Sequence, residues 1–256
     1  MVLNTPPKTR SVVIITGGSR GIGAATSRLF AAHGFDVCIN YRADAHSAHA
    51  LVAELQQGSA KVIAVQADVS DEQQVKRLFN TVDEQLGTLD VLVNNAGIIA
   101  QQMRLQEMTA ERIKRLLQTN ILGPFVCCQQ AVLRMSTALG GQGGCIVNVS
   151  SGAAKNGSPH EYIDYAATKG AVDTLTKGLA VEVAAEGIRV NAVRPGLIAT
   201  QMHADGGEPD RISRLQSQIP LRRGGQAEEV AEAIYWLASD KSSYTTGTLL
   251  DITGGR

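Results

Sequence analysis

Short apolar segments alternate with longer amphipathic segments along almost the whole chain. The apolar segments are rich in Val and Ile and mostly unbroken, which is typical of strands covered on both faces of a sheet. They predict strands at residues 11–16, 36–41, 61–67, 89–94, 145–150, 188–194 and 248–252. Helical patterns lie between them, near residues 22–33, 46–57, 72–86, 110–138, 164–186 and 227–238.

This alternation of strands and helices predicts the fold class. Seven strands separated by helices are expected to pair through right-handed crossovers, which gives an α/β fold with a doubly wound parallel sheet and helices on both faces. No change in composition and no internal repeat divides the chain, so we expect a single domain over residues 11–256. Residues 1–10 are polar and proline-containing, and we expect them to form a flexible arm.

Two segments do not follow the alternation. Residues 140–144 read GGQGG and predict a flexible loop before the fifth strand, whereas residues 200–220 form a long polar connection after the sixth. Long loops at the carboxyl ends of strands in such sheets tend to cover ligands. We therefore expect residues 200–220 to form a substrate loop, with a surface excursion that binds nothing as the alternative.

Composition and charge limit the classes of partner. The 256 residues are 44% hydrophobic and 19% charged, which predicts a globular chain rather than a disordered one. Lys plus Arg and Asp plus Glu are both 24, so the net charge is zero. That balance argues against a nucleic-acid or electrostatic membrane partner. No apolar run approaches the roughly 20 residues that a membrane span needs, and the N-terminus resembles neither a signal peptide nor a transit helix.

The cysteines and histidines show no metal-binding or redox spacing. Each cysteine lies inside an apolar segment, which predicts buried reduced thiols and fits a cytoplasmic location. The four are Cys38, Cys127, Cys128 and Cys145. His46 and His49 are three residues apart on a polar helix without an acidic partner in register, so we expect no metal site.

A glycine-rich loop follows the first predicted strand and leads directly into a helix. It reads Gly17-Gly18-Ser19-Arg20-Gly21-Ile22-Gly23. Glycine lets the backbone turn sharply and approach a pyrophosphate, and the helix N-terminus behind it offers free N–H groups and a positive dipole end. Because the loop closes the first strand of a βαβ alternation, it predicts a dinucleotide site and a Rossmann fold. It is not a P-loop, since no GK[ST] follows.

The spacing Gly17-x-x-x-Gly21-x-Gly23 resembles the TGxxxGxG loop of the short-chain dehydrogenase/reductase family. Residues 94–97 match its NNAG motif, and residues 165–169 match its YxxxK motif. Further matches, in the family's order, are Asn120, Ser150-Ser151 and Pro195-Gly196. The resemblance covers the chain from about residue 11 to its end. Within the family, residues 158–196 resemble the glucose 1-dehydrogenase-like bacterial oxidoreductases.

Tyr165 and Lys169 are four residues apart on a predicted helix, so their side chains share one face. A phenol has a pKa near 10, which a nearby ammonium and an oxidised nicotinamide ring are expected to lower. Tyr165 could then exchange a proton with a carbinol or carbonyl oxygen while hydride passes to or from the cofactor. The family resemblance implies that Lys169 also binds the nicotinamide ribose. Tyr162 lacks a lysine four residues on, where Ala166 stands.

A serine hydroxyl is needed to hold the substrate oxygen near the phenol. Ser150 and Ser151 both lie at the end of the fifth strand, but adjacent strand residues point in opposite directions. The resemblance places Ser151 in the catalytic position and leaves Ser150 as a strand-end residue. The separation from Ser151 to Tyr165 is one residue longer than is usual in the family, which predicts an insertion within residues 152–164.

Asn120 lies in the predicted helix 110–138, four residues before Pro124. Proline has no N–H to return to that carbonyl, and its ring clashes with it, which predicts a kink and a free Asn120 carbonyl. The family uses this position as a catalytic residue that holds a water between the lysine and solvent. A plain kink at residues 123–124, with Asn120 capping locally, is the alternative.

The end of the second strand predicts which cofactor is preferred. NAD-preferring members carry an Asp or Glu there, whereas this chain has Tyr41. Asp36 begins the strand and Asp44 lies three residues past its end, so neither takes that place. Arg42 and Arg20 can instead hydrogen-bond a 2′-phosphate, which predicts that NADP(H) is preferred and NAD(H) is possible.

The resemblance implies a larger set of cofactor-binding residues spread over the loops at the strand ends. They are Gly17, Ser19, Arg20, Gly21, Ile22, Gly23, Tyr41, Arg42, Asp68, Val69, Asn94, Ala96, Gly97, Tyr165, Lys169, Pro195, Gly196, Ile198 and Thr200.

The predicted function is NAD(P)(H)-dependent hydride transfer between the cofactor and a small secondary alcohol or ketone. A 3-oxoacyl-carrier-protein reductase is the alternative enzyme, because the same residues serve both reactions. A nucleotide-sensing or scaffold protein on the same fold is the alternative outside enzymes. The substrate depends on loops 152–164 and 200–220, which have no readable code. The resemblance also implies a homo-oligomer, most often a tetramer built on helices 110–138 and 164–186 and the C-terminal segment.

Overall fold

A computed structural model describes residues 10–256, and its seven strands form one parallel sheet in the order β3-β2-β1-β4-β5-β6-β7. The strands are β1 (Val12–Ile15), β2 (Asp36–Tyr41), β3 (Val62–Gln66), β4 (Leu89–Asn94), β5 (Gly144–Val149), β6 (Ile188–Pro195) and β7 (Leu249–Ile252). The order runs outward from β1 in both directions, so the predicted doubly wound, single-domain Rossmann sheet is confirmed.

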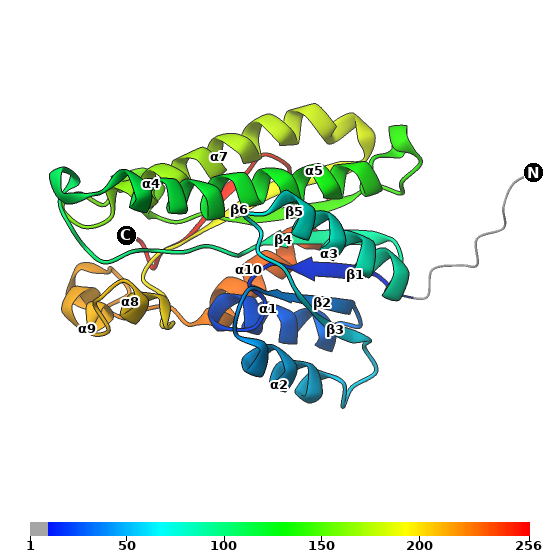
Figure 1. Ribbon diagram of the computed structural model, residues 1–256, viewed down its shortest axis with the longest axis horizontal. Helices are drawn as coiled ribbons and strands as arrows, with labels where there is room; N and C mark the ends of the chain where they lie inside the picture. Colours follow the sequence, from blue (N-terminus) through cyan, green and yellow to red (C-terminus); the bar gives the residue numbers. More distant parts are fainter. Residues whose placement is uncertain (1–9) are drawn as a thin grey trace, which may run out of the picture.

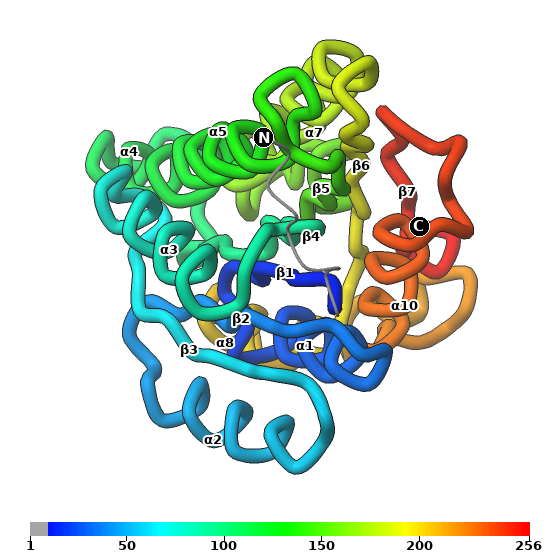
Figure 2. Tube along the Cα trace, turned by 90° about the vertical axis from the view of Figure 1, so that its right-hand side faces the viewer, coloured from blue at the N-terminus to red at the C-terminus, as the bar shows by residue number. Residues whose placement is uncertain are grey.

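Helices cover both faces of the sheet, as Figures 1 and 2 show. On one face lie α1 (Gly21–Ala32), α2 (Ala45–Leu55) and α10 (Ala227–Ala238). On the other lie α3 (Glu72–Gln85), α4 (Ala110–Leu117), α5 (Gly123–Met135) and α7 (Ile163–Val183). Short 3-10 turns join some of these elements, at η1 (Leu105–Glu107), η3 (Thr137–Leu139), η4 (Ala184–Glu186) and η6 (Asp240–Ser242).

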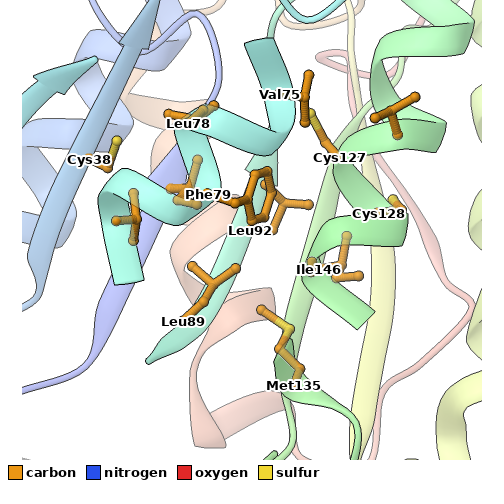
Figure 3. Packing of buried hydrophobic residues seen from close by; sticks show 14 of the residues in the cluster. Cys38, Val75, Leu78, Phe79, Leu89, Leu92, Cys127, Cys128, Met135 and Ile146 are labelled. Carbon is orange, nitrogen blue, oxygen red and sulfur yellow. The ribbon is translucent and has the colours of Figure 1, made fainter. Parts of the chain in front are cut away.

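The sheet separates two apolar cores, which explains why its strands are continuous apolar runs. In β1, Val12 and Ile14 pack into the core under α3, α5 and α7, whereas Val13 and Ile15 pack into the core under α1, α2 and α10. Figure 3 shows part of the first core, where Phe79 of α3 lies among buried side chains of β4, β5 and α5. Full burial of each such side chain stabilises the fold by about 1.5–3 kcal/mol.

The predicted helix 110–138 is interrupted. α4 ends at Leu117, a π-helical turn, η2 (Gln118–Leu122), follows, and α5 begins at Gly123. The Gly123 N–H donates to the carbonyl of Gln118, five residues earlier, immediately before Pro124, which has no N–H to give. The break therefore lies where the proline predicted it, but it takes the form of a wider turn rather than a plain kink.

Both loops that were expected to border a ligand contain short helices. Residues 152–164 include α6 (Ala153–Asn156), and residues 200–220 include α8 (Met202–Asp205), α9 (Arg211–Leu215) and the 3-10 turn η5 (Gln216–Gln218). The sequence predicted a long polar connection over residues 200–220 but none of the short helices within it. Elements of one or two turns are too short to show a hydrophobic period.

Several smaller predictions can be compared with the structure. All four cysteines are buried free thiols, as expected. Of the predicted arm, residues 1–9 lie outside the described residues, and the guanidinium of Arg10 lies 3.8 Å from the carboxylate of Asp36. Within residues 10–256, no helix is long and apolar enough to cross a membrane.

Candidate active site

The carboxyl ends of β1, β4, β5 and β6 meet at one edge of the sheet, and the strand order reverses between β1 and β4. Ligands of such sheets bind at this reversal point. Two cavities lie there and share Met202 in their walls. The first, of about 560 Å³, is lined by the glycine loop, and the second, of about 510 Å³, is lined by Ser151, Tyr165 and part of residues 197–218.

The glycine loop is held in a conformation that other residues would disturb. Gly17 and Gly21 have φ of 60° and 50°, in the left-handed region that favours glycine. A Cβ atom on Gly23 would lie 2.2 Å from the carbonyl oxygen of Gly17. The Asn95 side chain donates to the carbonyls of Thr16 and Gly17, at 2.9 and 3.0 Å. The backbone therefore approaches the first cavity closely, and the N-terminus of α1 borders it, as a pyrophosphate site requires.

The far end of the first cavity contains the residues expected to distinguish NADP(H) from NAD(H). Tyr41 is buried, whereas Arg20 and Arg42 are exposed. Asp44 also lines the cavity, although it lies beyond the strand end. Its carboxylate accepts hydrogen bonds from the Ser47 N–H and hydroxyl, at 3.0 and 2.7 Å, which hold its pKa below the usual range. It also lies 3.8 Å from the Arg20 guanidinium, so this carboxylate caps α2 and orients Arg20.

Most of the predicted cofactor residues line the first cavity, and the remainder lie elsewhere. Those that line it are Gly17, Ser19, Arg20, Gly21, Ile22, Tyr41, Arg42, Asp68, Val69, Ala96, Gly97 and Thr200. Pro195, Gly196 and Tyr165 line the second cavity. Gly23 packs against the backbone of Gly17 and Gly18, and Ile198 is buried in the core under α10.

Asn94 does not line the first cavity, and its side chain bonds to residues between the sheet and α5, so its part in cofactor binding stays a prediction. The side chain donates to Asn148 Oδ1 at 2.9 Å and to Cys128 Sγ at 3.3 Å. Sequence reasoning missed Asn40 at the end of β2, whose Oδ1 accepts the Gly17 N–H at 3.4 Å, and Asn95, which follows β4. A buried asparagine at a strand end was the signal that could have revealed Asn40.

The structure brings Ser151, Tyr165 and Lys169 together. Ser151 and Tyr165 both line the second cavity. The Lys169 ammonium lies 5.7 Å from the Tyr165 ring centroid and donates to the Val149 carbonyl at 2.7 Å. Ser150 points the other way, and its hydroxyl donates to the Lys169 carbonyl at 3.2 Å, as the alternation along a strand predicted.

Burial dominates the electrostatics of this group. It raises the pKa of Tyr165 to about 12, and the hydrogen bond from Ser151 opposes that rise. It lowers the pKa of Lys169 to about 8, and the Asp173 carboxylate opposes that fall. The expectation of a lowered phenol pKa also counts the positive charge of an oxidised nicotinamide ring, and it stays a prediction.

The Asn120 side chain is fully buried and binds another segment instead of capping its own helix. Its Oδ1 accepts the Ile98 N–H at 2.8 Å, and its Nδ2 donates to the Ile98 carbonyl at 2.9 Å and to Thr168 Oγ1 at 3.2 Å. The alternative of local capping is therefore wrong. Asn120 ties the loop after β4 to α7, one residue before Lys169.

A buried ion pair fixes the residue that precedes Tyr165. Arg112 of α4 and Asp164 of α7 are 9% and 3% exposed, and Arg112 Nε lies 2.6 Å from Asp164 Oδ2. Arg112 also donates to the Gln101 carbonyl at 2.5 Å, and Asp164 Oδ1 accepts the Tyr165 N–H at 2.9 Å. The pair therefore connects α4, the loop after β4 and the first turn of α7.

We expect the substitution Arg112→Met to lower the free energy of unfolding by about 3–5 kcal/mol, because it leaves the Asp164 carboxylate buried and unpaired. Urea denaturation of the purified variant measures this loss. Arg115→Met, at an exposed position of the same helix, is the matched control and should change stability by less than about 0.5 kcal/mol. An equal loss in both variants would show that the ion pair does not anchor α7.

Charged side chains form one wall of the second cavity. The Arg211 guanidinium pairs with Glu161 and with Glu208, the latter at 2.8 Å, and lies 5.0 Å from the Tyr162 ring centroid. The Tyr162 hydroxyl donates to the Gly206 carbonyl at 3.1 Å. Tyr162 therefore helps to hold the segment around α9 against residues 158–162, and it has no lysine beside it, as expected.

Together, the glycine loop at the reversal point and the Ser-Tyr-Lys group beside it define a nicotinamide-dependent oxidoreductase on a Rossmann fold. A family model described as "Enoyl-(Acyl carrier protein) reductase" matches residues 17–256. The chain belongs to the short-chain dehydrogenase/reductase family.

Curated relatives match over almost their full length. An uncharacterized oxidoreductase of Escherichia coli is 55% identical over 246 residues, covering 96% of this chain and all of that protein. A 3-oxoacyl-[acyl-carrier-protein] reductase of Staphylococcus aureus is 39% identical, covering 94% of this chain and 96% of the relative. A glucose 1-dehydrogenase of Bacillus subtilis, from the branch that the sequence resembles, is 35% identical, covering 96% and 95%.

Solved structures with bound cofactor also match. A blue fluorescent protein from a metagenomic library, in complex with NADPH, has a TM-score of 0.87 and 36% identity, covering 96% of this chain and 97% of the other. A 3-ketoacyl-(acyl-carrier-protein) reductase from Brucella melitensis, complexed with NADH, has a TM-score of 0.89 and 32% identity, covering 96% and 98%. These complexes support a nicotinamide cofactor for this fold without choosing between NADPH and NADH.

Proposed function

We propose that this protein transfers hydride between NADP(H) and a small secondary alcohol or ketone, with Tyr165 as general acid and base. The placement of Ser151 and Tyr165 in the wall of one cavity, with Lys169 behind them, carries the proposal. A survey of sugars, steroids, simple ketones and acyl thioesters, followed by the absorbance of the reduced nicotinamide, tests it. If the protein binds the cofactor but turns over none of these compounds, the proposal is contradicted.

Ser151, Tyr165 and Lys169 would orient the substrate and move the proton. A bound nicotinamide supplies or accepts the hydride. The Ser151 hydroxyl orients the substrate oxygen, and Tyr165, whose raised pKa keeps the phenol protonated at neutral pH, donates a proton to a carbonyl oxygen. In alcohol oxidation Tyr165 must instead accept the proton, and the Ser151 hydrogen bond and the Lys169 charge favour the phenolate.

The first cavity fits the rest of a dinucleotide. Its glycine loop admits no side chain at Gly23, and the N-terminus of α1 borders it, so pyrophosphate oxygens would find backbone N–H groups and the positive end of the helix dipole. Asp68 and Val69, which follow β3, line the same cavity and would hold the adenine ring.

The preference for NADP(H) is part of the proposal, and the exposed guanidinium groups of Arg20 and Arg42 support it. We expect Arg20→Ala combined with Arg42→Ala to lower the ratio of kcat/KM for NADPH to that for NADH by at least about tenfold, or ~1.4 kcal/mol. Each charge-assisted hydrogen bond to the 2′-phosphate contributes about 1.5–3 kcal/mol.

Steady-state kinetics with both cofactors give the ratio before and after the substitutions. Arg28→Ala is the matched control, since this arginine of α1 pairs with Glu54 outside the cavity and should leave the ratio unchanged. A wild-type ratio that favours NADH by tenfold would show that the arginines do not read the 2′-phosphate.

A 3-oxoacyl-carrier-protein reductase is the second candidate function. The reductase relative is more similar to this chain than the glucose 1-dehydrogenase, at 39% against 35% identity, and a solved reductase gives a TM-score of 0.89. The acyl thioesters in the same survey distinguish the two functions. A nucleotide-sensing protein on this fold would bind cofactor and reduce none of the compounds.

The proposal includes a homotetramer in the cytoplasm. Large apolar side chains stay exposed along η2 and α5 at Leu122, Phe125 and Leu133, and on α7 at Val181, which is 83% exposed. Exposed apolar side chains grouped on neighbouring helices indicate an interface, and we propose that a second copy of this chain buries them. Four free, buried cysteine thiols support a reducing compartment.

A further inference from the structure

A third titratable residue extends the stripe that Tyr165 and Lys169 form on α7. Asp173 follows Lys169 by four residues, so all three side chains lie on one face of the helix at intervals of one turn. All three are buried, with 8%, 4% and 7% of their surfaces exposed. The proposed reaction gives Asp173 no part, and a buried carboxylate requires a physical reason.

The ion pair with Arg194 of β6 engages only one oxygen of the Asp173 carboxylate. Arg194 Nε and Nη2 both donate to Asp173 Oδ2, at 3.0 and 2.6 Å. Asp173 Oδ1 is buried without a hydrogen-bond partner among residues 10–256. An arginine that served only to neutralise a carboxylate would bind both oxygens as a fork. One oxygen of Asp173 is thus left with its charge and without a donor.

Arg194 is also shared with a second carboxylate. Its Nη1 lies 3.7 Å from Asp251 of β7, and Asp251 pairs with Lys155 of α6 at 2.7 Å. Because two carboxylates share the one guanidinium, Arg194 compensates the negative charge of Asp173 only in part. Asp173 itself follows Lys169 by one helical turn on α7.

The other groups around Lys169 offer it little negative charge. On α7, Tyr165 precedes it and has a protonated phenol at neutral pH. The end of β5 supplies the neutral Val149 carbonyl, and the neutral Asn120 side chain of η2 lies, like the Lys169 ammonium, next to Gly97. Burial lowers the pKa of Lys169, and Asp173 is the charged group that opposes this fall.

We infer that Asp173 is a positioning residue of the active site, which keeps the buried Lys169 ammonium charged by Coulombic attraction from one turn further along α7. This inference rests on the proposed function, in which the charged lysine favours the Tyr165 phenolate. Asp173 acts through Lys169 and lines neither cavity.

Competitive acetylation with acetic anhydride over a series of pH values tests the inference without any turnover. Mass spectrometry of the peptide that contains Lys169 gives its reactivity, and the midpoint of the reactivity curve reports protonation of the lysine. In Asp173→Asn we expect this midpoint to fall by at least about half a pKa unit, because the neutral amide no longer opposes the effect of burial on the lysine. Asp173→Glu should keep most of the wild-type midpoint.

Glu182→Gln is the matched control, because it removes a carboxylate from an exposed position of the same helix, outside the Arg194 network, and should leave the Lys169 midpoint unchanged. Arg194→Gln provides a second variant, should Asp173→Asn fail to fold. It removes a cation from the same network and leaves Asp173 with its full charge, so it should raise the midpoint. An unchanged midpoint in Asp173→Asn, or a lower one in Arg194→Gln, would overturn the inference.

Kinetics separate this inference from the proposed function. If both hold, the alkaline limb of the kcat profile of Asp173→Asn moves to lower pH together with the acetylation midpoint. If the midpoint falls but neither wild type nor variant transfers hydride, the electrostatic role of Asp173 is supported and the proposed function fails. If hydride transfer is present and the midpoint does not move, Asp173 is only structural.

Discussion

The substitution Tyr165→Phe is expected to lower kcat by on the order of 10²–10⁴, because phenylalanine keeps the ring but has no proton to exchange with the substrate oxygen. Cofactor affinity should change little, since the phenol lies in the second cavity and the glycine loop lines the first. Turnover measured with saturating cofactor and the best compound of the survey gives the loss.

Tyr235→Phe is the matched control, because Tyr235 packs against Phe30 on the opposite face of the sheet and should keep full activity. A primary isotope effect from deuterated cofactor shows whether hydride transfer limits the rate. If it does, and Tyr165→Phe retains a tenth of wild-type turnover, Tyr165 is not the general acid.

The raised pKa of Tyr165 also bears on the direction of the reaction. At about 12 it keeps the phenol protonated at neutral pH, which is the form needed to reduce a carbonyl. Alcohol oxidation needs the phenolate, whose population rises with pH up to that value. If Tyr165 is the general acid and base, we expect the rate of reduction to be highest near neutral pH and the rate of oxidation to rise with pH.

The substitution Gly23→Ala is expected to weaken cofactor binding by on the order of 100-fold, or about 3 kcal/mol. A Cβ atom there would lie 2.2 Å from the Gly17 carbonyl oxygen and 2.9 Å from the Gly18 Cα, both backbone atoms of the glycine loop. The loop must move away, and it then no longer presents its N–H groups to a pyrophosphate.

Isothermal titration with NADPH measures the dissociation constant. Gly58→Ala is the control, because a Cβ atom there meets nothing closer than 3.5 Å and the residue lies in a surface turn outside both cavities. An unchanged dissociation constant in a folded Gly23→Ala variant would mean that the glycine loop does not hold the cofactor.

The fold could be predicted almost completely from the sequence, for a physical reason visible in β1. Val12 to Ile15 alternate between two buried cores, so every position must be apolar, and such runs are recognisable without any knowledge of their partners. The same alternation separated Ser151 from Ser150. Alternation showed only that these two serines point in opposite directions, and the family resemblance chose Ser151.

What could not be predicted depends on contacts between distant segments. Asn120 binds the backbone of Ile98, and Arg211 pairs with Glu161, 50 residues away in the chain. The sequence analysis excluded Asp44 from the cofactor site because it lies past the strand end. In the structure Asp44 caps α2 and lines the cavity. No spacing rule along the chain expresses such contacts, because each is decided by how two loops pack in three dimensions.

Hydride transfer by the wild-type chain is the measurement that tests the central claim most directly. NADPH is mixed with each ketone, sugar, steroid and 3-oxoacyl thioester in turn, and the absorbance of the reduced nicotinamide is followed beside the Tyr165→Phe variant. We expect oxidation of NADPH with at least one carbonyl compound, and its loss in the variant. Tight NADPH binding without turnover of any compound, or equal turnover in both proteins, would contradict the assignment of this site.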